Sequence, residues 1–349
     1  MSLKPLVELL ESLFEPDALQ RFVHLELDAE AIVHNVDFKA APARVAYEVA
    51  RALQRDGYID SQLFAKLRAV SPRRAKDIDD VAILFAEPLS PVGRHTHVIT
   101  LEAAIAGRIS AIDDEQVRAA LGTTTSLSRL RLDLHDLDPL AGDPSVWSEG
   151  QARIQRAIQE HIRDVVLESG ARHLSLFGQG PIPWLIAFGH AVSETIDADV
   201  FQRFRAPAGW SWQPDDPELD RWSVISDPDP PTVRDVAVLV SASARVRRER
   251  VDAVLPPADR ATYEITLAEP RLDAVRSKAQ LEAFARDYRE LLGQIEARHP
   301  GLERLHIFAA APVAVVIECG RRILHNAAPV IVTYEFTDKR YCKALELLP

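Results

Sequence analysis

The 349-residue chain is poor in the residue types that mark secreted, membrane and zinc-binding proteins. It has two cysteines, Cys319 and Cys342, which are too few for a disulfide framework or a four-ligand zinc site. No apolar run approaches the length needed to cross a bilayer. The N-terminus mixes acids into its apolar positions, unlike a secretory signal. We therefore expect a cytoplasmic protein with a buried thiol at Cys319.

The chain also lacks an excess of basic residues. Its 41 Lys and Arg are outnumbered by 52 Asp and Glu, and the formal net charge is −11. Nucleic-acid polymers and anionic membranes both favour a basic protein face, so we expect no DNA or RNA polymer and no membrane as partner. A small polyanion remains compatible, because the run Arg245-Val246-Arg247-Arg248 can make a pocket locally basic.

The common catalytic and phosphate-binding motifs are missing. Gly178-x-Gly180 would need a third glycine at position 183 to be a dinucleotide fingerprint, and that residue is Pro183. There is no Walker lysine motif, no H-E-x-x-H and no G-x-S-x-G. His95 and His97 stand two apart, but no carboxylate or cysteine nearby completes a metal site. We predict a binding protein with no catalytic residues, no metal and no cofactor.

What the sequence does contain is an internal repeat. HLSLFGQGPIPWLIAFG (173–189) and RLHIFAAAPVAVVIECG (304–320) both fit a strand, a Phe, three residues, a Pro, seven residues and a Gly. Three pairs of residues keep the same offset of 131 positions: Phe177 with Phe308, Pro181 with Pro312, and Gly189 with Gly320. Such a repeat predicts two similar α/β lobes side by side, with one ligand shared between them.

The period of the hydrophobic pattern divides the chain. Residues 1–85 show helical spacing and predict a bundle of about five or six short helices; the clearest segments are 3–14, 17–26, 28–36, 43–54 and 61–70. The Pro-rich residues 86–96 predict a linker. Strands and helices then alternate, which predicts two tandem Rossmann-like lobes with mainly parallel sheets. We place lobe one at 97–206, a connector at 207–232 and lobe two at 233–349.

Candidate ligand-binding residues follow from the predicted sheets. In open parallel sheets, ligands bind beyond the carboxyl ends of the strands. Small residues and a helix N-terminus at the repeated turns favour an anion such as phosphate. Tryptophans of the connector can stack bases, or they can simply anchor the connector. The predicted set is Gly178, Gln179, Gly180, Pro181, Trp210, Trp212, Ser241, Ser243, Arg245, Ala309, Ala310, Ala311 and Pro312.

The doubled signature, followed by Trp210-Ser211-Trp212, resembles the SAVED domain, a fusion of two CARF-like lobes. The resemblance covers about residues 95–345. It implies a sensor of cyclic oligonucleotides in prokaryotic antiphage defence of the CRISPR type III or CBASS kind. The implied ligand is a cyclic tri- or tetra-adenylate bound across both lobes.

Residues 1–85 resemble a bacterial death-like, effector-associated domain, in LVELLESLF, ALQRF and VAYEVARALQRDGYIDSQLFAKLRAVSPRR. That family makes homotypic contacts. The resemblance therefore implies that ligand-driven, head-to-tail oligomerisation recruits an effector protein, for example a protease, through this domain. Two alternatives remain open. The chain could be a ring nuclease that degrades its cyclic ligand, or a sensor fragment of a longer protease or nuclease effector.

Overall fold

The computed structural model describes residues 3–348 apart from 28, 30–31, 34–35, 56–57, 60, 79–80, 82–94, 106, 109–110, 141–142, 170–172, 215–220, 228–232 and 324–328. The chain divides into two compact units, Met1–Val92 and Gly93–Pro349. Most of the predicted linker lies outside the described residues. Its last two residues, His95 and Thr96, begin the first strand of the second unit.

The described residues of the first unit form helices around a core of their own. These helices are α1 (Lys4–Leu13), α2 (Pro16–Arg21) with the π-helical turn η1 (Phe22–Glu26), α4 (Pro42–Arg55), α5 (Ser61–Val70) and the 3₁₀ turn η2 (Pro72–Arg74). Their apolar positions recur at helical spacing, so that Leu6, Leu10, Val49 and Leu53 are fully buried. The helix predicted at 28–36 lies largely outside the described residues.

The second unit contains two mainly parallel sheets, as the sequence predicts, and a two-stranded antiparallel sheet of β5 (Phe204–Arg205) and β6 (Ala208–Gly209), which was not predicted. Lobe one orders its four parallel strands β2-β1-β3-β4: β1 (His95–Glu102), β2 (Thr125–Asp133), β3 (His173–Gln179) and β4 (Asp197–Val200). Lobe two repeats this order as β9-β8-β10-β11: β8 (Asp235–Ser241), β9 (Arg260–Thr266), β10 (Arg304–Ala310) and β11 (Val330–Thr337). Each of these four strands of lobe one therefore has a counterpart at the same place in lobe two.

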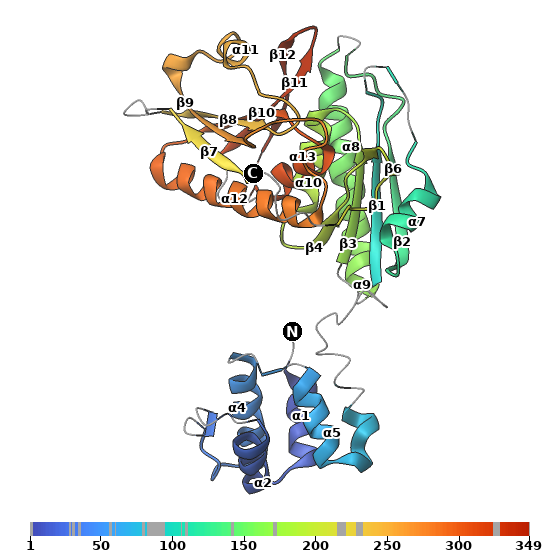
Figure 1. Cartoon of the computed structure of the whole chain (residues 1–349), viewed down its shortest axis with the longest axis vertical. Coiled ribbons are helices and arrows are strands. Elements are labelled where there is room, and N and C mark those ends of the chain that lie inside the picture. Colours follow the sequence, from blue (N-terminus) through green and yellow to red (C-terminus); the bar gives the residue numbers. More distant parts are fainter. Residues whose placement is uncertain are drawn as a thin grey trace. The chain divides into compact units, whose positions relative to one another are not determined.

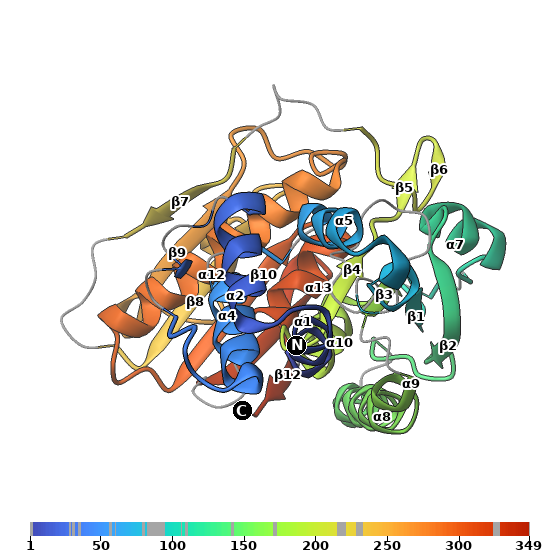
Figure 2. The same ribbon diagram turned by 90° about the horizontal axis from the view of Figure 1, so that it is seen from below.

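Two antiparallel edge strands widen the sheet of lobe two, and neither was predicted. β7 (Ser223–Ser226) pairs with β9, and β12 (Arg340–Leu347) pairs with β11. β12 largely alternates buried and exposed residues, which is the period of a half-buried strand. β7 falls within the predicted connector and lies at the opposite end of the unit from helix α7 (Asp114–Leu121) (Figures 1 and 2).

The helices form one shared layer and two outer ones. A single core joins the inner faces of both sheets to α8 (Ser145–His161), α10 (Ile182–Val192), α12 (Lys278–Arg298) and α13 (Val313–Arg321). α7 packs on the other face of lobe one, and α11 (Arg248–Asp252) packs on the other face of lobe two. The thiol of Cys319 is buried in the shared core, as predicted, and this burial raises its pKa.

The three repeated residues each have a structural reason. Phe177 stacks on Phe201 with ring centroids 4.4 Å apart, and Phe308 stacks on Tyr334 at 4.1 Å. Both prolines precede the first helical residue, where the fixed φ of Pro suits the turn.

The repeated glycines let the two lobes dock. α10 and α13 lie against each other where the lobes meet (Figure 1). A Cβ atom on Gly189 would stand 2.0 Å from the carbonyl oxygen of Ile317, and one on Gly320 would stand 2.0 Å from that of Ile186. Only glycine allows this approach, so the repeat ends at the residue where the helices cross.

Candidate functional site

A cavity of about 800 Å³ lies where the two lobes meet at the carboxyl ends of their strands. Its walls come from segments that follow β1, β3, β4, β8, β9 and β10. The polar and small residues among its lining are Gln179, Gly180, Gln202, Arg203, Arg205, Ala206, Ala208, Gln213, Ser243, Asp273, Arg276, Ala311 and Pro312. Both lobes therefore contribute to one site, at the edge where parallel sheets usually bind ligands.

The two repeated turns are held in the same way. In lobe one, the Gln179 carbonyl accepts a hydrogen bond from the Ala103 amide at 2.8 Å. In lobe two, the Ala310 carbonyl accepts one from the Ser243 amide at 2.7 Å. Each turn is thus tied to the segment after the first strand of its own lobe, and this brings Ser243 to the cavity.

The helix N-termini differ from the prediction, which treated their amides as free for phosphate. The Ile182 amide of α10 donates to Glu335 Oε2 at 3.0 Å, and the Ala314 amide of α13 donates to Gln202 Oε1 at 3.1 Å. Each cap comes from the opposite lobe, because docking brings the strand end of one lobe to the helix start of the other. Burial raises the pKa of Glu335 to about 7, against the lowering effect of its hydrogen bonds from the Ile182 and Phe336 amides.

Positive charge in the cavity comes from three arginines. Arg276 is paired with Asp273, the one carboxylate among the described lining residues. Arg203 lies over the Trp210 ring, 5.8 Å from its centroid, and donates to the Phe204 carbonyl. Neither Arg203 nor Arg205 has a carboxylate partner within the described part of the chain. These two guanidinium groups are therefore available to an anionic ligand.

Five of the thirteen predicted residues line the cavity: Gln179, Gly180, Ser243, Ala311 and Pro312. Of the others, Gly178 serves packing, since a Cβ there would stand 2.8 Å from Ile317 Cδ1. Ser241 is fully buried, and its hydroxyl accepts from the Val246 amide. Pro181, Ala309 and Ala310 do not line the cavity; they shape the turns around it.

Arg245 and the tryptophans lie away from the cavity lining. The Arg245 guanidinium donates to the Ala268 carbonyl at 3.3 Å. Trp210 is 1% exposed and packs edge-on against Phe177, so its ring belongs to the outer core of lobe one. Trp212 packs edge-on against Phe204, and Trp222 donates to the Gln280 carbonyl. These positions match the alternative in which the tryptophans anchor the connector.

Sequence reasoning missed the segments that supply most of the charge. Gln202, Arg203 and Arg205 follow β4, and the stretch from Leu272 to Arg276 follows β9. The carboxyl-end rule applies to these strands as well. The prediction used this rule mainly for the strands that are followed by small-residue turns. Its use on every strand would have identified the segments after β4 and β9.

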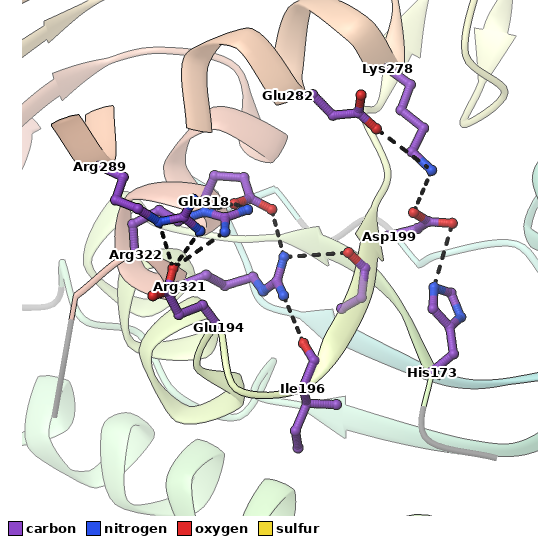
Figure 3. A network of polar contacts seen from close by, with 11 residues as sticks. His173, Glu194, Ile196, Asp199, Lys278, Glu282, Arg289, Glu318, Arg321 and Arg322 are labelled. Atoms are coloured by element: carbon purple, nitrogen blue, oxygen red, sulfur yellow. Dashed lines mark hydrogen bonds and ion pairs between the residues drawn. The ribbon is translucent and has the colours of Figure 1, made fainter. Parts of the chain in front are cut away.

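A network of charged side chains joins the lobes at the other end of α13 (Figure 3). Arg321 and Glu318 are each 3% exposed and pair at 2.8 Å, and Arg321 also donates to the Ile196 carbonyl at 3.0 Å. Glu194 accepts from both Arg289 and Arg322, while Lys278 pairs with Asp199 at 2.6 Å. The bonds to Ile196, Glu194 and Asp199 cross between the lobes, so they hold the two cavity walls in a fixed relation.

Within the described ranges, no group of three His, Cys, Asp or Glu side chains could hold a metal ion. His97 is buried in β1, where Ser128 and Ser169 bond its two ring nitrogens. A search of the described helices for one long and apolar enough to span a bilayer finds none.

Comparison with known proteins gives one family match. The profile of SAVED, the "SMODS-associated and fused to various effectors sensor domain", matches residues 151–347. No curated protein matches the chain.

Solved structures share the fold at low sequence identity. Two are of the Acinetobacter baumannii Cap4 SAVED/CARF-domain containing receptor, with the cyclic trinucleotides 2'3'3'-cAAA and 3'3'3'-cAAA. They are 13% and 14% identical to this chain, with TM-scores of 0.51 and 0.52. Each comparison covers 98% of this chain and 78% of the receptor chain.

Proposed function

Because this chain belongs to the SAVED family of sensor domains, we propose that it senses a cyclic oligonucleotide of prokaryotic antiphage defence. One observation carries the proposal. The cavity between the lobes presents Arg203 and Arg205 without carboxylate partners among the described residues, in a protein of net charge −11. An acidic protein with a locally basic cavity selects small anions over nucleic-acid polymers.

The cavity suits a compact ligand with several phosphates. Its volume of about 800 Å³ lies within the range of roughly 300–1,000 Å³ that small-molecule sites occupy. Guanidinium groups bind phosphate through paired, charge-assisted hydrogen bonds. Small residues at Gly180 and Ala311 allow the ligand to approach the backbone from both lobes. A ring with a phosphate at each linkage can contact both walls at once.

We take the ring to be a cyclic oligoadenylate with three or four adenosines. The similar fold of the Cap4 receptor, whose structures contain cyclic triadenylates, supports testing the ring of three adenosines first. We also propose binding without cleavage. Among the described lining residues there is no histidine, and the carboxylate of Asp273 is held by Arg276. Incubating the ring with the protein and finding it intact by chromatography would agree with a sensor; linear products would not.

Calorimetry on the full chain tests ligand and site together. We expect sub-micromolar binding of cyclic triadenylate or tetra-adenylate, and a loss of roughly 10-fold or more for Arg203→Ala and for Arg205→Ala. The matched control is Arg286→Ala, an exposed arginine on α12 that pairs with Asp287. No heat with any cyclic di-, tri- or tetranucleotide would refute the proposed function. Equal losses of affinity for all three variants would show that the ligand does not bind at Arg203 and Arg205.

The output is proposed to be recruitment. Ligand binding would favour head-to-tail stacking of residues 93–349, because two non-identical lobes leave two different outer faces, and such contacts propagate. Residues 1–85 would then act as a death-like docking module that gathers an effector protein by multivalency. Their separate hydrophobic core supports a module that folds independently of the sensor.

Two measurements address this output. Light scattering should show a mass increase when ligand is added. A ligand-saturated protein that stays monomeric at tens of micromolar would contradict head-to-tail stacking and would support a sensor that does not oligomerise. Removal of residues 1–85 should leave ligand binding intact and abolish protection in cells. Protection by the truncated protein, or cleavage of nucleic acid, protein or NAD by residues 1–85 alone, would contradict the docking role.

A further inference from the structure

The two repeated turns differ at one polar position. Gln179 ends β3 in lobe one, and the 131-residue offset places Ala310 at the end of β10 in lobe two. Lobe one therefore brings a primary amide to the cavity at a position where lobe two has a methyl group. The two turns differ here in the side chain only, because the backbone carbonyls of both residues accept the same kind of hydrogen bond.

The Gln179 amide is incompletely satisfied. Gln179 lines the cavity, yet its Oε1 is buried and accepts no hydrogen bond from the residues that the structure describes. Gln202, the other glutamine that lobe one supplies, is fully used: Oε1 accepts from the Ala314 amide, and Nε2 donates to the Arg203 carbonyl at 2.7 Å. One glutamine thus holds the lobes together, while the other keeps an acceptor to which a ligand could donate.

A primary amide has the hydrogen-bonding pattern that adenine requires. It offers an acceptor beside a donor, and adenine presents its exocyclic amino donor beside the N7 acceptor, so the two pair through two bonds. Gln179 Oε1 is covered in this structure, and rotation about the broad terminal torsion of the side chain turns both amide atoms toward the cavity. On the same edge, oxopurines such as hypoxanthine present two acceptors, the carbonyl oxygen and N7, so they cannot complete that pair.

We propose that Gln179 reads one adenine of the bound ring, with Oε1 accepting from the exocyclic amino group and Nε2 donating to N7. This inference rests on the proposed function, because it assigns base selectivity to the same cavity. It also predicts that base selectivity comes from lobe one alone. Ala310 has no side-chain donor or acceptor, so the base nearest lobe two is not recognised through such a pair.

The test compares two rings on the full-length protein by calorimetry. The parent should bind cyclic triadenylate about 10-fold tighter than cyclic tri-inosinate, in which a carbonyl oxygen replaces each exocyclic amino group. Gln179→Met keeps the length of the side chain without its hydrogen bonds. We expect it to lose about 10-fold in affinity for the adenylate and to bind the two rings almost equally. Gln294→Met, on the exposed face of α12, is the matched control and should behave as the parent.

The outcomes separate this inference from the proposed function. A parent that binds neither ring refutes both. A parent that binds both rings equally refutes base reading alone, and this result does not depend on the folding of any variant. Gln179→Met that melts like the parent and keeps both affinity and preference also refutes it.

Discussion

Lobe one and lobe two share strand order, turn geometry and the crossing glycines, but the facing positions of α10 and α13 differ in chemistry. α13 carries Glu318 and Arg321, whereas the offset of 131 residues places Ala187 and His190 on α10. The buried pair of α13 reaches across to the carbonyls of Ile196 and Ala198 in lobe one. The repeat is therefore strict where backbones touch and variable where side chains bridge the lobes.

The same division holds at the cavity. Both turns keep proline before the helix, yet α10 is capped by the carboxylate of Glu335 and α13 by the neutral amide of Gln202. Arg203 and Arg205 belong to lobe one, and the paired Asp273 and Arg276 belong to lobe two. Duplicated lobes can thus form a ligand site whose two halves are electrostatically unlike.

The largest effect is expected where the lobes differ most, at the buried ion pair. Arg321→Met should lower the free energy of unfolding by about 3 kcal/mol, because it leaves Glu318 buried with Arg322 as its remaining partner. Denaturant unfolding of the full chain measures this. Replacing both members, as in Glu318→Leu with Arg321→Met, should cost less than the single change. Arg286→Met, in an exposed pair, should cost at most about 1 kcal/mol; an equal cost at both sites would contradict the argument.

The next effect tests what the lobes share. Gly189→Ala and Gly320→Ala should each destabilise by about 2–3 kcal/mol, because each new methyl group meets a backbone carbonyl of the opposite helix. Gly293→Ala is the control, since a Cβ there meets nothing within 4 Å. It should instead stabilise α12 by up to about 1 kcal/mol. If only one of the two substitutions destabilises the protein, the two glycines do not contribute equally to the packing of α10 against α13.

A smaller effect is expected when charge is placed on the two turns. Gly180→Asp and Ala311→Asp should each weaken binding of cyclic triadenylate about 10-fold, because a carboxylate would enter the cavity in which we propose that the phosphates bind. Gly180→Asn and Ala311→Asn have the same size without the charge and should bind more tightly than their Asp partners. Calorimetry that shows no difference between Asp and Asn would place the phosphates away from these turns.

The smallest effect concerns the carboxylate cap of α10. The pKa of Glu335 is raised to about 7 in the folded protein. At pH values between the ordinary pKa of a glutamate and 7, the folded protein therefore holds a proton on Glu335 that the unfolded chain has released. Stability from this group is present at low pH and is lost as pH rises through 7. Glu335→Gln should therefore match the parent near pH 4 and exceed it by about 1–2 kcal/mol at pH 8. Thermal melting across this pH range checks the sign; a constant difference would exclude titration of Glu335.

Prediction from sequence succeeded for features set by nearby residues. The helical spacing around Leu6 and Leu10 and the apolar strands before Phe177 and Phe308 are local patterns, and the structure has helices and strands at those places. It failed for β7 and β12, which are short or half-exposed edge strands with weak patterns. It also offered Trp210 as a stacking residue, because composition alone does not separate a loop aromatic from a core one.

By itself, the sequence determined the duplication and the parallel sheets, because hydrophobic period and repeat offset are properties of the chain. Tertiary structure alone decided which groups meet at the cavity between the lobes. Glu335 and Gln202 reach the helices of the opposite lobe, and Arg203 and Arg205 reach the cavity, only because α10 and α13 cross at Gly189 and Gly320. Contacts between segments so far apart in sequence depend on how the lobes dock, and the repeated glycines alone do not show which of these segments the docking brings together.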